Sequence, residues 1–106
     1  MVRSLICVCV FTIGLAATAS AQDGAKIFVD QKCTLCHAIA GKGNAKGALD
    51  DVGSKLSADE IRSWITDAKG MTAKTKATRK PEMKSYSLPK ADVDALVTYL
   101  SGLKKK

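Results

Sequence analysis

The sequence has little histidine, proline or aromatic character. One histidine and two prolines occur in 106 residues, and the aromatic residues are one tryptophan, two tyrosines and two phenylalanines. A single imidazole excludes a zinc site that uses two histidines. So few large side chains also give a domain of this length a modest hydrophobic core. No segment alternates apolar and polar residues clearly enough to predict a strand, and no internal repeat is found.

The long apolar segment lies at the N-terminus. Arg3 gives a short positive start, residues 5–17 are almost wholly apolar, and Ala19-Ser20-Ala21 is a small-x-small cleavage site. This pattern predicts a secretory signal peptide over residues 1–21, cut after Ala21, and one exported domain over residues 22–106. A membrane anchor is the alternative, but the apolar run is short for a span of about 20 residues.

Acidic residues are outnumbered. Of the 17 Lys and Arg only Arg3 precedes the cleavage site, so residues 22–106 carry 16 basic and 10 acidic side chains, a formal charge of +6. A basic exported protein is attracted to acidic proteins, anionic membranes or polyanions. Charge alone does not distinguish these partners.

Three segments show the i, i+3, i+4 spacing of apolar residues that is typical of amphipathic helices. The predicted helices run from Asp23 to about Cys33, from the capping box Ser57-Ala58-Asp59-Glu60 to a stop at Gly70, and from about Pro89 to Gly102. Their apolar positions are Ala25, Phe28 and Val29; Ile61, Trp64, Ile65 and Ala68; and Val93, Leu96, Val97 and Leu100.

Two long loops separate these helices. Residues 41–55 hold four of the eight glycines, which is typical of irregular structure. Residues 71–88 contain Pro81 and a cluster of basic side chains with one acid, Glu82; the basic residues are Lys74, Lys76, Arg79, Lys80 and Lys84. The sequence therefore predicts an all-α domain with three main helices and two long loops. Loops of this length in a small domain are commonly functional.

Residues 33–37 read Cys-Thr-Leu-Cys-His and include the single histidine. A structural zinc site needs two more ligands, and the other cysteines, Cys7 and Cys9, fall in the predicted signal peptide. A thiol–disulfide oxidoreductase uses C-x-x-C in a βαβ setting that this sequence does not supply. Nucleophilic Cys–His catalysis normally pairs residues distant in sequence, and a plain disulfide gives His37 no role.

In C-x-x-C-H, the two thiols form thioethers with the vinyl groups of haem and the imidazole becomes an axial iron ligand. This interpretation uses Cys33, Cys36 and His37 together. It also agrees with export, because c-type haem is attached outside the cytoplasm. We therefore predict one covalently bound haem c.

With these motifs, the sequence resembles a small class I cytochrome c of the bacterial periplasmic kind. The resemblance covers nearly all of residues 22–106: an N-terminal helix leading into CXXCH, a glycine-rich loop, a capped middle helix, a Pro-x-Met segment and a C-terminal helix. It implies a cytochrome c fold wrapped around the haem. It also implies a close crossing of the first and last helices, for which the candidates are Gly24, Phe28, Tyr99 and Leu100.

The resemblance also implies the sixth ligand. In the family, a methionine in a Pro-x-Met segment shortly before the last helix binds the iron, and Pro81-Glu82-Met83 matches that segment. We expect Met83 to be the ligand opposite His37, and Met71 to pack in the core. Trp64 and Tyr86 are candidates for contact with the haem propionates, and core packing is the alternative for Trp64.

Two positions depart from the family pattern. Family members often have a proline in the loop after CXXCH, and the carbonyl of that proline accepts a hydrogen bond from the ligand histidine. Here the corresponding residue is Gly47, whose carbonyl can still serve. Glu82 and Lys84 flank Met83 where small or apolar residues are frequent.

An iron with both axial positions filled leaves no open site for a substrate. The expected function is therefore a soluble, monomeric, periplasmic electron carrier, not an enzyme, with no nucleic-acid partner and no stable membrane insertion after cleavage. The basic residues at 74–84 are expected to ring the haem edge and to dock on acidic patches of redox partner proteins. A solvated basic loop is the alternative.

Two other functions stay open at this point. One is a haem enzyme or sensor with an open sixth position, peroxidase-like or gas-binding, which requires that Met83 does not bind iron. The other is a polyanion- or nucleic-acid-binding module, suggested by the charge and by the run Lys-Thr-Lys-Ala-Thr-Arg-Lys at 74–80. That run lacks the interleaved aromatic residues of a stacking platform.

Overall fold

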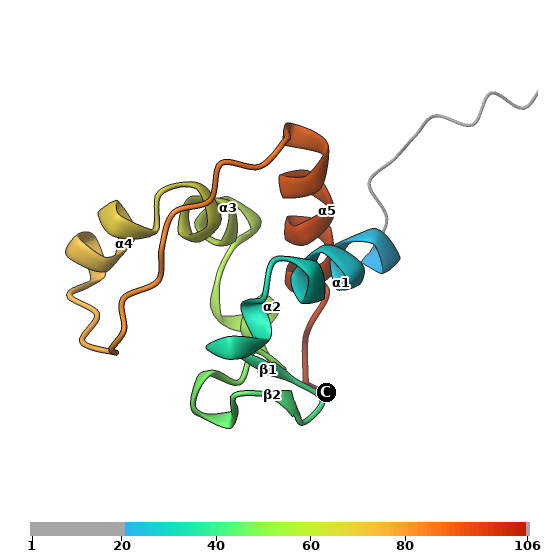
Figure 1. Cartoon of the computed structure of the whole chain (residues 1–106), viewed down its shortest axis with the longest axis horizontal. Helices are drawn as coiled ribbons and strands as arrows, with labels where there is room; N and C mark the ends of the chain where they lie inside the picture. Colours follow the sequence, from blue (N-terminus) through green and yellow to red (C-terminus); the bar gives the residue numbers. More distant parts are fainter. Residues whose placement is uncertain (1–20, 106) are drawn as a thin grey trace, which may run out of the picture.

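The computed structural model describes residues 21–105, and these form a mostly helical domain (Figure 1). The predicted signal peptide, except Ala21, lies outside the described residues. The helices are α1 Ala21–Asp30, α2 Val52–Lys55, α3 Ala58–Thr66, α4 Ala68–Thr75 and α5 Lys90–Ser101; two 3-10 turns, Cys33–Leu35 and Ala45–Gly47, and two short strands, β1 Ala38–Ile39 and β2 Lys42–Gly43, complete the order. In the described part of the chain, no helix is long and apolar enough to cross a membrane.

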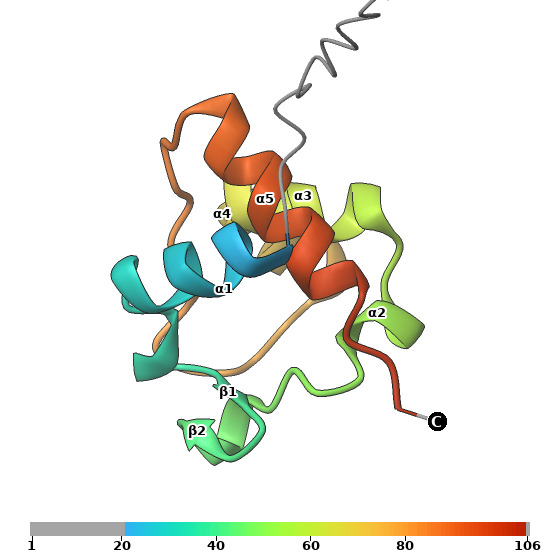
Figure 2. The ribbon, with the colours of Figure 1, turned by 90° about the vertical axis from the view of Figure 1, so that its right-hand side faces the viewer.

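The first and last helices cross closely, as the resemblance implied (Figure 2). Gly24 is buried at the crossing, where a Cβ atom would overlap the carbonyl oxygen of Ala95 and the Cβ of Tyr99. One turn later, the rings of Phe28 and Tyr99 meet edge to face with centroids 6.3 Å apart. A residue without a side chain is therefore what allows these two helices to touch.

The predicted apolar face of α1 was wrong at one position. Val29 is 60% exposed, whereas Gly24 and Phe28 are buried. The crossing is centred on these two residues, which turns Val29 toward solvent. The helix also ends at Asp30 instead of near Cys33, and Lys32 then adopts a left-handed conformation with φ 59°.

The capping box of the second predicted helix is confirmed. The Ser57 side chain accepts a hydrogen bond from the backbone N–H of Glu60, and the Glu60 carboxylate accepts one from the backbone N–H of Ser57. The predicted stop at Gly70 was wrong. The helix ends at Thr66, and Asp67 caps a new helix, α4, by accepting a hydrogen bond from Gly70 N–H.

The third predicted helix is confirmed with small shifts. Pro89 is the N-cap of α5 instead of its first helical residue, and Gly102 is the C-cap. The four predicted apolar positions of α5 are all buried. They form one core with α1 and α3, made of Phe28, Ile61, Ile65, Val93, Leu96, Val97 and Leu100.

One small sheet lies in the loop after residue 37 and was not predicted. Strands β1 and β2 pair antiparallel, with Ala38 opposite Gly43 and Ile39 opposite Lys42. Two residues per strand are too few to produce a readable alternation. The hairpin shapes the glycine-rich loop that follows the first 3-10 turn.

Candidate functional site

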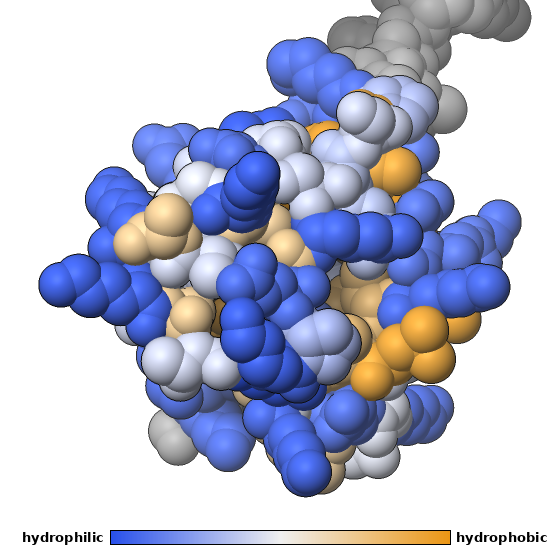
Figure 3. All heavy atoms as spheres, turned by 60° about the vertical axis from the view of Figure 1, so that its left-hand side comes forward, coloured by the Kyte–Doolittle hydropathy of each residue, from blue (hydrophilic) through white to orange (hydrophobic). Residues whose placement is uncertain are grey.

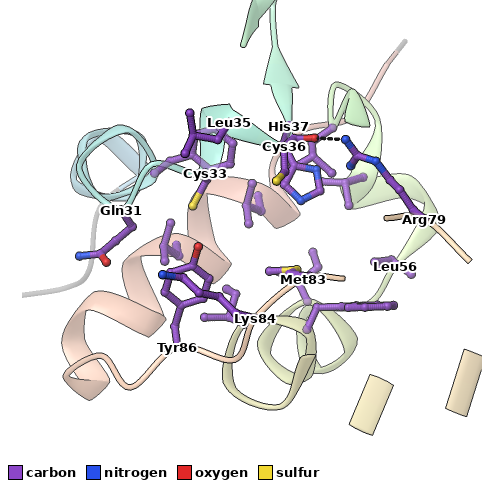
Figure 4. Close-up of a pocket in the computed structure, with 18 of the residues that line it drawn as sticks. Gln31, Cys33, Leu35, Cys36, His37, Leu56, Arg79, Met83, Lys84 and Tyr86 are labelled. Carbon is purple, nitrogen blue, oxygen red and sulfur yellow. Dashed lines mark hydrogen bonds between the residues drawn. The ribbon is translucent and has the colours of Figure 1, made fainter. Parts of the chain in front are cut away.

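The four predicted site residues line one cavity of about 700 Å³ (Figure 4). Cys33, Cys36 and His37 come from the first 3-10 turn and the residues after it, and Met83 comes from the segment between α4 and α5. Apolar side chains of α1, α3 and α5 complete the wall; among them are Phe28, Ile61, Ile65, Leu96 and Leu100. The fold thus brings together donors that lie about 50 positions apart in the sequence.

A tight turn places the two cysteines and the histidine on one wall. The backbone N–H groups of Cys36 and His37 both donate to the carbonyl of Cys33, over 3.1 and 2.9 Å. Both thiols are half-buried and not joined in a disulfide, and Figure 4 shows both sulfur atoms beside the cavity. Burial raises the pKa of the Cys33 thiol, and the nearby Tyr86 side chain partly offsets that rise.

His37 is held in a defined tautomer. Its Nδ1 lies 3.0 Å from the carbonyl oxygen of Gly47, the acceptor suggested by the sequence. A carbonyl only accepts hydrogen bonds, so Nδ1 carries the proton and Nε2 keeps a free lone pair. Burial lowers the pKa of His37, the hydrogen bond to Gly47 partly opposes that shift, and the nearby charge of Arg79 adds to it, so the net shift favours the neutral ring. A neutral imidazole with a fixed second nitrogen is the form that ligates a metal.

Met83 lies across the cavity from His37 (Figure 4). Its side chain is half-buried, and the residues just after it form hydrogen bonds with α3 and α4. Tyr86 N–H donates to Ile65 O over 2.8 Å, and Lys69 N–H donates to Ser85 Oγ over 3.4 Å. The thioether therefore faces the imidazole from a segment anchored to the core.

The comparison with protein families matches a model described as "Cytochrome c" to residues 21–104. The chain belongs to the cytochrome c family. Its mostly helical architecture is that of a small cytochrome c, and the family implies covalently bound haem c and a haem-based role in electron transfer.

One curated relative is the cytochrome c oxidase subunit 2 of Alkalihalophilus pseudofirmus. It is 27% identical over 93 residues, which cover 79% of this cytochrome and 26% of the relative. The chain thus spans about a quarter of the length of that protein. No solved structure gave a significant match.

The donor set of the cytochrome fits a haem. The cavity offers two free thiols on one wall, one neutral imidazole and one thioether, in a mainly apolar surround. Within residues 21–105, no three side chains of His, Cys, Asp or Glu gather as a cluster that would hold a bare metal ion. Two thiols for attachment, an imidazole and a thioether would suit an iron porphyrin better than a metal held by protein ligands alone.

Trp64 and Tyr86 both line the cavity of the cytochrome, so each can contact what it holds. Trp64 is half-buried, whereas Ile61 and Ile65 are buried in the core, and all three line the cavity.

In the sequence, Arg79 is only one of several basic residues of the loop over residues 71–88. In the cytochrome, its Nη2 donates a hydrogen bond of 2.5 Å to the carbonyl of Cys36 (Figure 4). No local pattern distinguishes Arg79 from the lysines around it, and Cys36 lies 43 positions away. This contact could be found only in the folded chain.

Proposed function

We propose that this cytochrome is a soluble electron carrier with one haem c, attached through Cys33 and Cys36 and ligated by His37 and Met83. One observation carries the proposal: the two thiols, the free Nε2 of His37 and the sulfur of Met83 all border a single cavity, with His37 and Met83 on opposite sides. When bound, the haem supplies an iron that alternates between its ferric and ferrous states.

The residues of the chain have separable tasks in this proposal. Cys33 and Cys36 fix the porphyrin edge, and the Gly47 carbonyl orients the His37 ring through Nδ1. The Met83 sulfur would be the second protein ligand of the iron and would favour its ferrous state, which would raise the reduction potential. The apolar wall excludes water from the metal. An iron held by both His37 and Met83 would leave no open site for a substrate, so the protein would act as a carrier and not as an enzyme.

Substitution of the two methionines tests the ligand assignment. In Met83→Leu, the weak near-infrared absorption band of methionine-ligated ferric haem should disappear, the ferrous protein should bind carbon monoxide stoichiometrically, and the potential should fall. Met71→Leu is the matched control, because Met71 is buried in α4; its spectrum should be that of the wild type. A wild-type protein that lacks the band and binds carbon monoxide would instead indicate a haem enzyme or gas sensor.

The covalent attachment and the export have their own measurements. Haem should resist acid–acetone extraction from the wild type, and the mass of the exported protein should equal residues 22–106 plus one haem. A chain that begins before Gln22 would contradict cleavage after Ala21. These results would also establish the periplasmic location that we propose from the N-terminal sequence.

Basic side chains surround the Met83 segment, which supports docking on acidic redox partners. Lys76, Lys80 and Lys84 are exposed, although Lys80 is paired with Glu82 at 2.9 Å and Lys84 stacks over the Tyr86 ring. Figure 3 shows the face on the side of α4, where hydrophilic side chains dominate and apolar surface is confined to small areas between them. Such a surface increases the rate of encounter with an acidic partner more than it increases affinity.

A further inference from the structure

Arg79 connects the two parts of the cytochrome that carry the two proposed iron ligands, His37 and Met83. It belongs to the segment between α4 and α5, four residues before Met83, and its guanidinium donates to the carbonyl of Cys36. That carbonyl belongs to the peptide group that links Cys36 to His37. A single side chain therefore joins the methionine segment to the turn that carries the histidine.

Gly47 makes room for this contact. A Cβ atom at position 47 would overlap both the Cys36 carbonyl oxygen and Nη1 of Arg79. The ring of a proline, which family members often have at the corresponding place, would therefore occupy the space of the guanidinium. The departure of this sequence from the family pattern and the position of Arg79 are one structural feature.

Hydrogen bonds hold the methionine segment on both sides of Met83. In the described chain, Ala77 N–H donates to Thr72 O of α4 before Arg79, and after Met83 the segment bonds to α4 and α3 at Ser85 and Tyr86. Before Met83, the Lys80–Glu82 pair stays within the segment itself. Met83 thus lies between an anchor on α3 and the hydrogen bond of Arg79 to Cys36.

We propose that Arg79 is a positioning residue that fastens the Met83 segment to the Cys36–His37 turn and so limits how often Met83 leaves the iron. The proposal rests on the ligation by Met83 proposed above. Because a guanidinium bonded to a carbonyl is a charge-assisted hydrogen bond, its loss should release the segment more often without unfolding the helices.

Cyanide binding to the ferric haem-loaded protein tests the proposal, because cyanide enters only when Met83 departs. Cyanide binding is measured by the loss of the near-infrared band. Its rate in Arg79→Gln should rise about tenfold above that of the wild type. Lys76→Gln is the matched control, because it removes the same positive charge from an exposed side chain three residues before Arg79. The cyanide-binding rate of this variant should stay within about twofold of the wild type. Equal rates in the two variants would overturn the proposal.

The variant Arg79→Lys distinguishes the effect of the hydrogen bond to Cys36 from the effect of the positive charge. A lysine keeps the positive charge but is shorter and lacks the planar fork. If Arg79 acts by fastening, Arg79→Lys should bind cyanide as fast as Arg79→Gln while its reduction potential stays at the wild-type value. A wild-type cyanide rate in Arg79→Lys would show that charge alone is responsible, which contradicts the proposal.

The link to Gly47 gives a second test. Gly47→Ala should also speed cyanide binding, but its effect should be smaller in the Arg79→Gln background, because the overlap with the guanidinium is then absent and only the overlap with the Cys36 carbonyl remains. Full additivity would contradict a shared role.

Amide hydrogen exchange gives a readout that does not need Met83 to be a ligand. Residues 77–84 should exchange faster in Arg79→Gln than in the wild type and in Lys76→Gln. If the wild type lacks the near-infrared band, ligation by Met83 fails, yet faster exchange in Arg79→Gln would still support fastening. Unchanged exchange would overturn it.

Discussion

Gly24 occupies the point where α1 and α5 come closest, so its substitution tests the packing of the whole domain. In Gly24→Ala, the new methyl group would meet the carbonyl oxygen of Ala95, a backbone atom that moves only if the helices separate. We expect a loss of about 1–3 kcal/mol in the free energy of unfolding, typical of overpacking.

Urea denaturation of the haem-loaded protein measures this loss. Gly102→Ala is the control, because a Cβ atom at position 102 would have its nearest neighbours at 3.5 Å, an ordinary contact. That variant should stay within about 0.5 kcal/mol of the wild type. A similar loss of unfolding free energy in both variants would show that the α1–α5 crossing has room for a methyl group at position 24.

The residues of the site differ in how far the sequence predicted them. The CXXCH spacing predicted Cys33, Cys36 and His37 as one group, since the chemistry of attachment needs all three within five positions. The acceptor of His37 was suggested by the family pattern, and the hydrogen bond to Gly47 agrees. Arg79 had no such signal, because its partner is fixed by the fold and not by spacing.

Helices α3 and α5 are joined by a cluster of charges outside the core. Asp94 of α5 pairs with Arg62 of α3 at 2.7 Å and with Lys90, one turn earlier, at 2.8 Å. The hydrogen bond from Lys90, followed by that from Arg62, holds the pKa of Asp94 below its ordinary value of 3.8. A carboxylate with a lowered pKa stabilises the folded chain above its unfolded pKa, and this contribution is lost as pH falls through the folded pKa.

Asp94→Asn should therefore be less stable than the wild type at pH 7, and the two proteins should converge as the pH falls through the lowered folded pKa of Asp94. The measurement is the urea midpoint of each protein at neutral and acidic pH. Asp30→Asn, at an exposed carboxylate at the end of α1, should follow the wild type at both. A gap between Asp94→Asn and wild type that is the same at pH 7 and in acid would exclude the ionised pairs as its cause.

The limits of the helices show what a sequence pattern can and cannot predict. Ser57 and Glu60 predicted the start of α3, because both partners of the capping box lie within one turn. The end of that helix was misplaced, since the pattern did not reveal that the side chain of Asp67 starts another helix at Ala68. Strands of two residues, such as β1 and β2, leave no periodic signal at all.

The excess of basic residues should govern how the whole cytochrome meets an anionic oxidant. Reduced protein should transfer its electron to hexacyanoferrate(III) at least about tenfold more slowly as salt rises from about 10 to 500 mM, because ions screen the attraction. A rate that is indifferent to salt would remove the proposed docking role of the basic surface.

A pair of double variants locates the effect. The double variant Lys76→Gln with Lys80→Gln removes two positive charges near Met83. The double variant Lys104→Gln with Lys105→Gln removes two positive charges at the C-terminal end of the described chain. At low salt, the first pair should slow the reaction more than the second. Equal slowing would indicate that overall charge, and not this surface, attracts the oxidant.

The crossing of α1 and α5 also bears on when the chain can fold. Its two halves, Ala21–Asp30 and Lys90–Ser101, are separated by most of the described residues. A ribosome must complete α5 before Gly24 and Phe28 find their partners, and contacts between such distant segments form late. The nascent polypeptide therefore lacks its principal helix pair throughout synthesis.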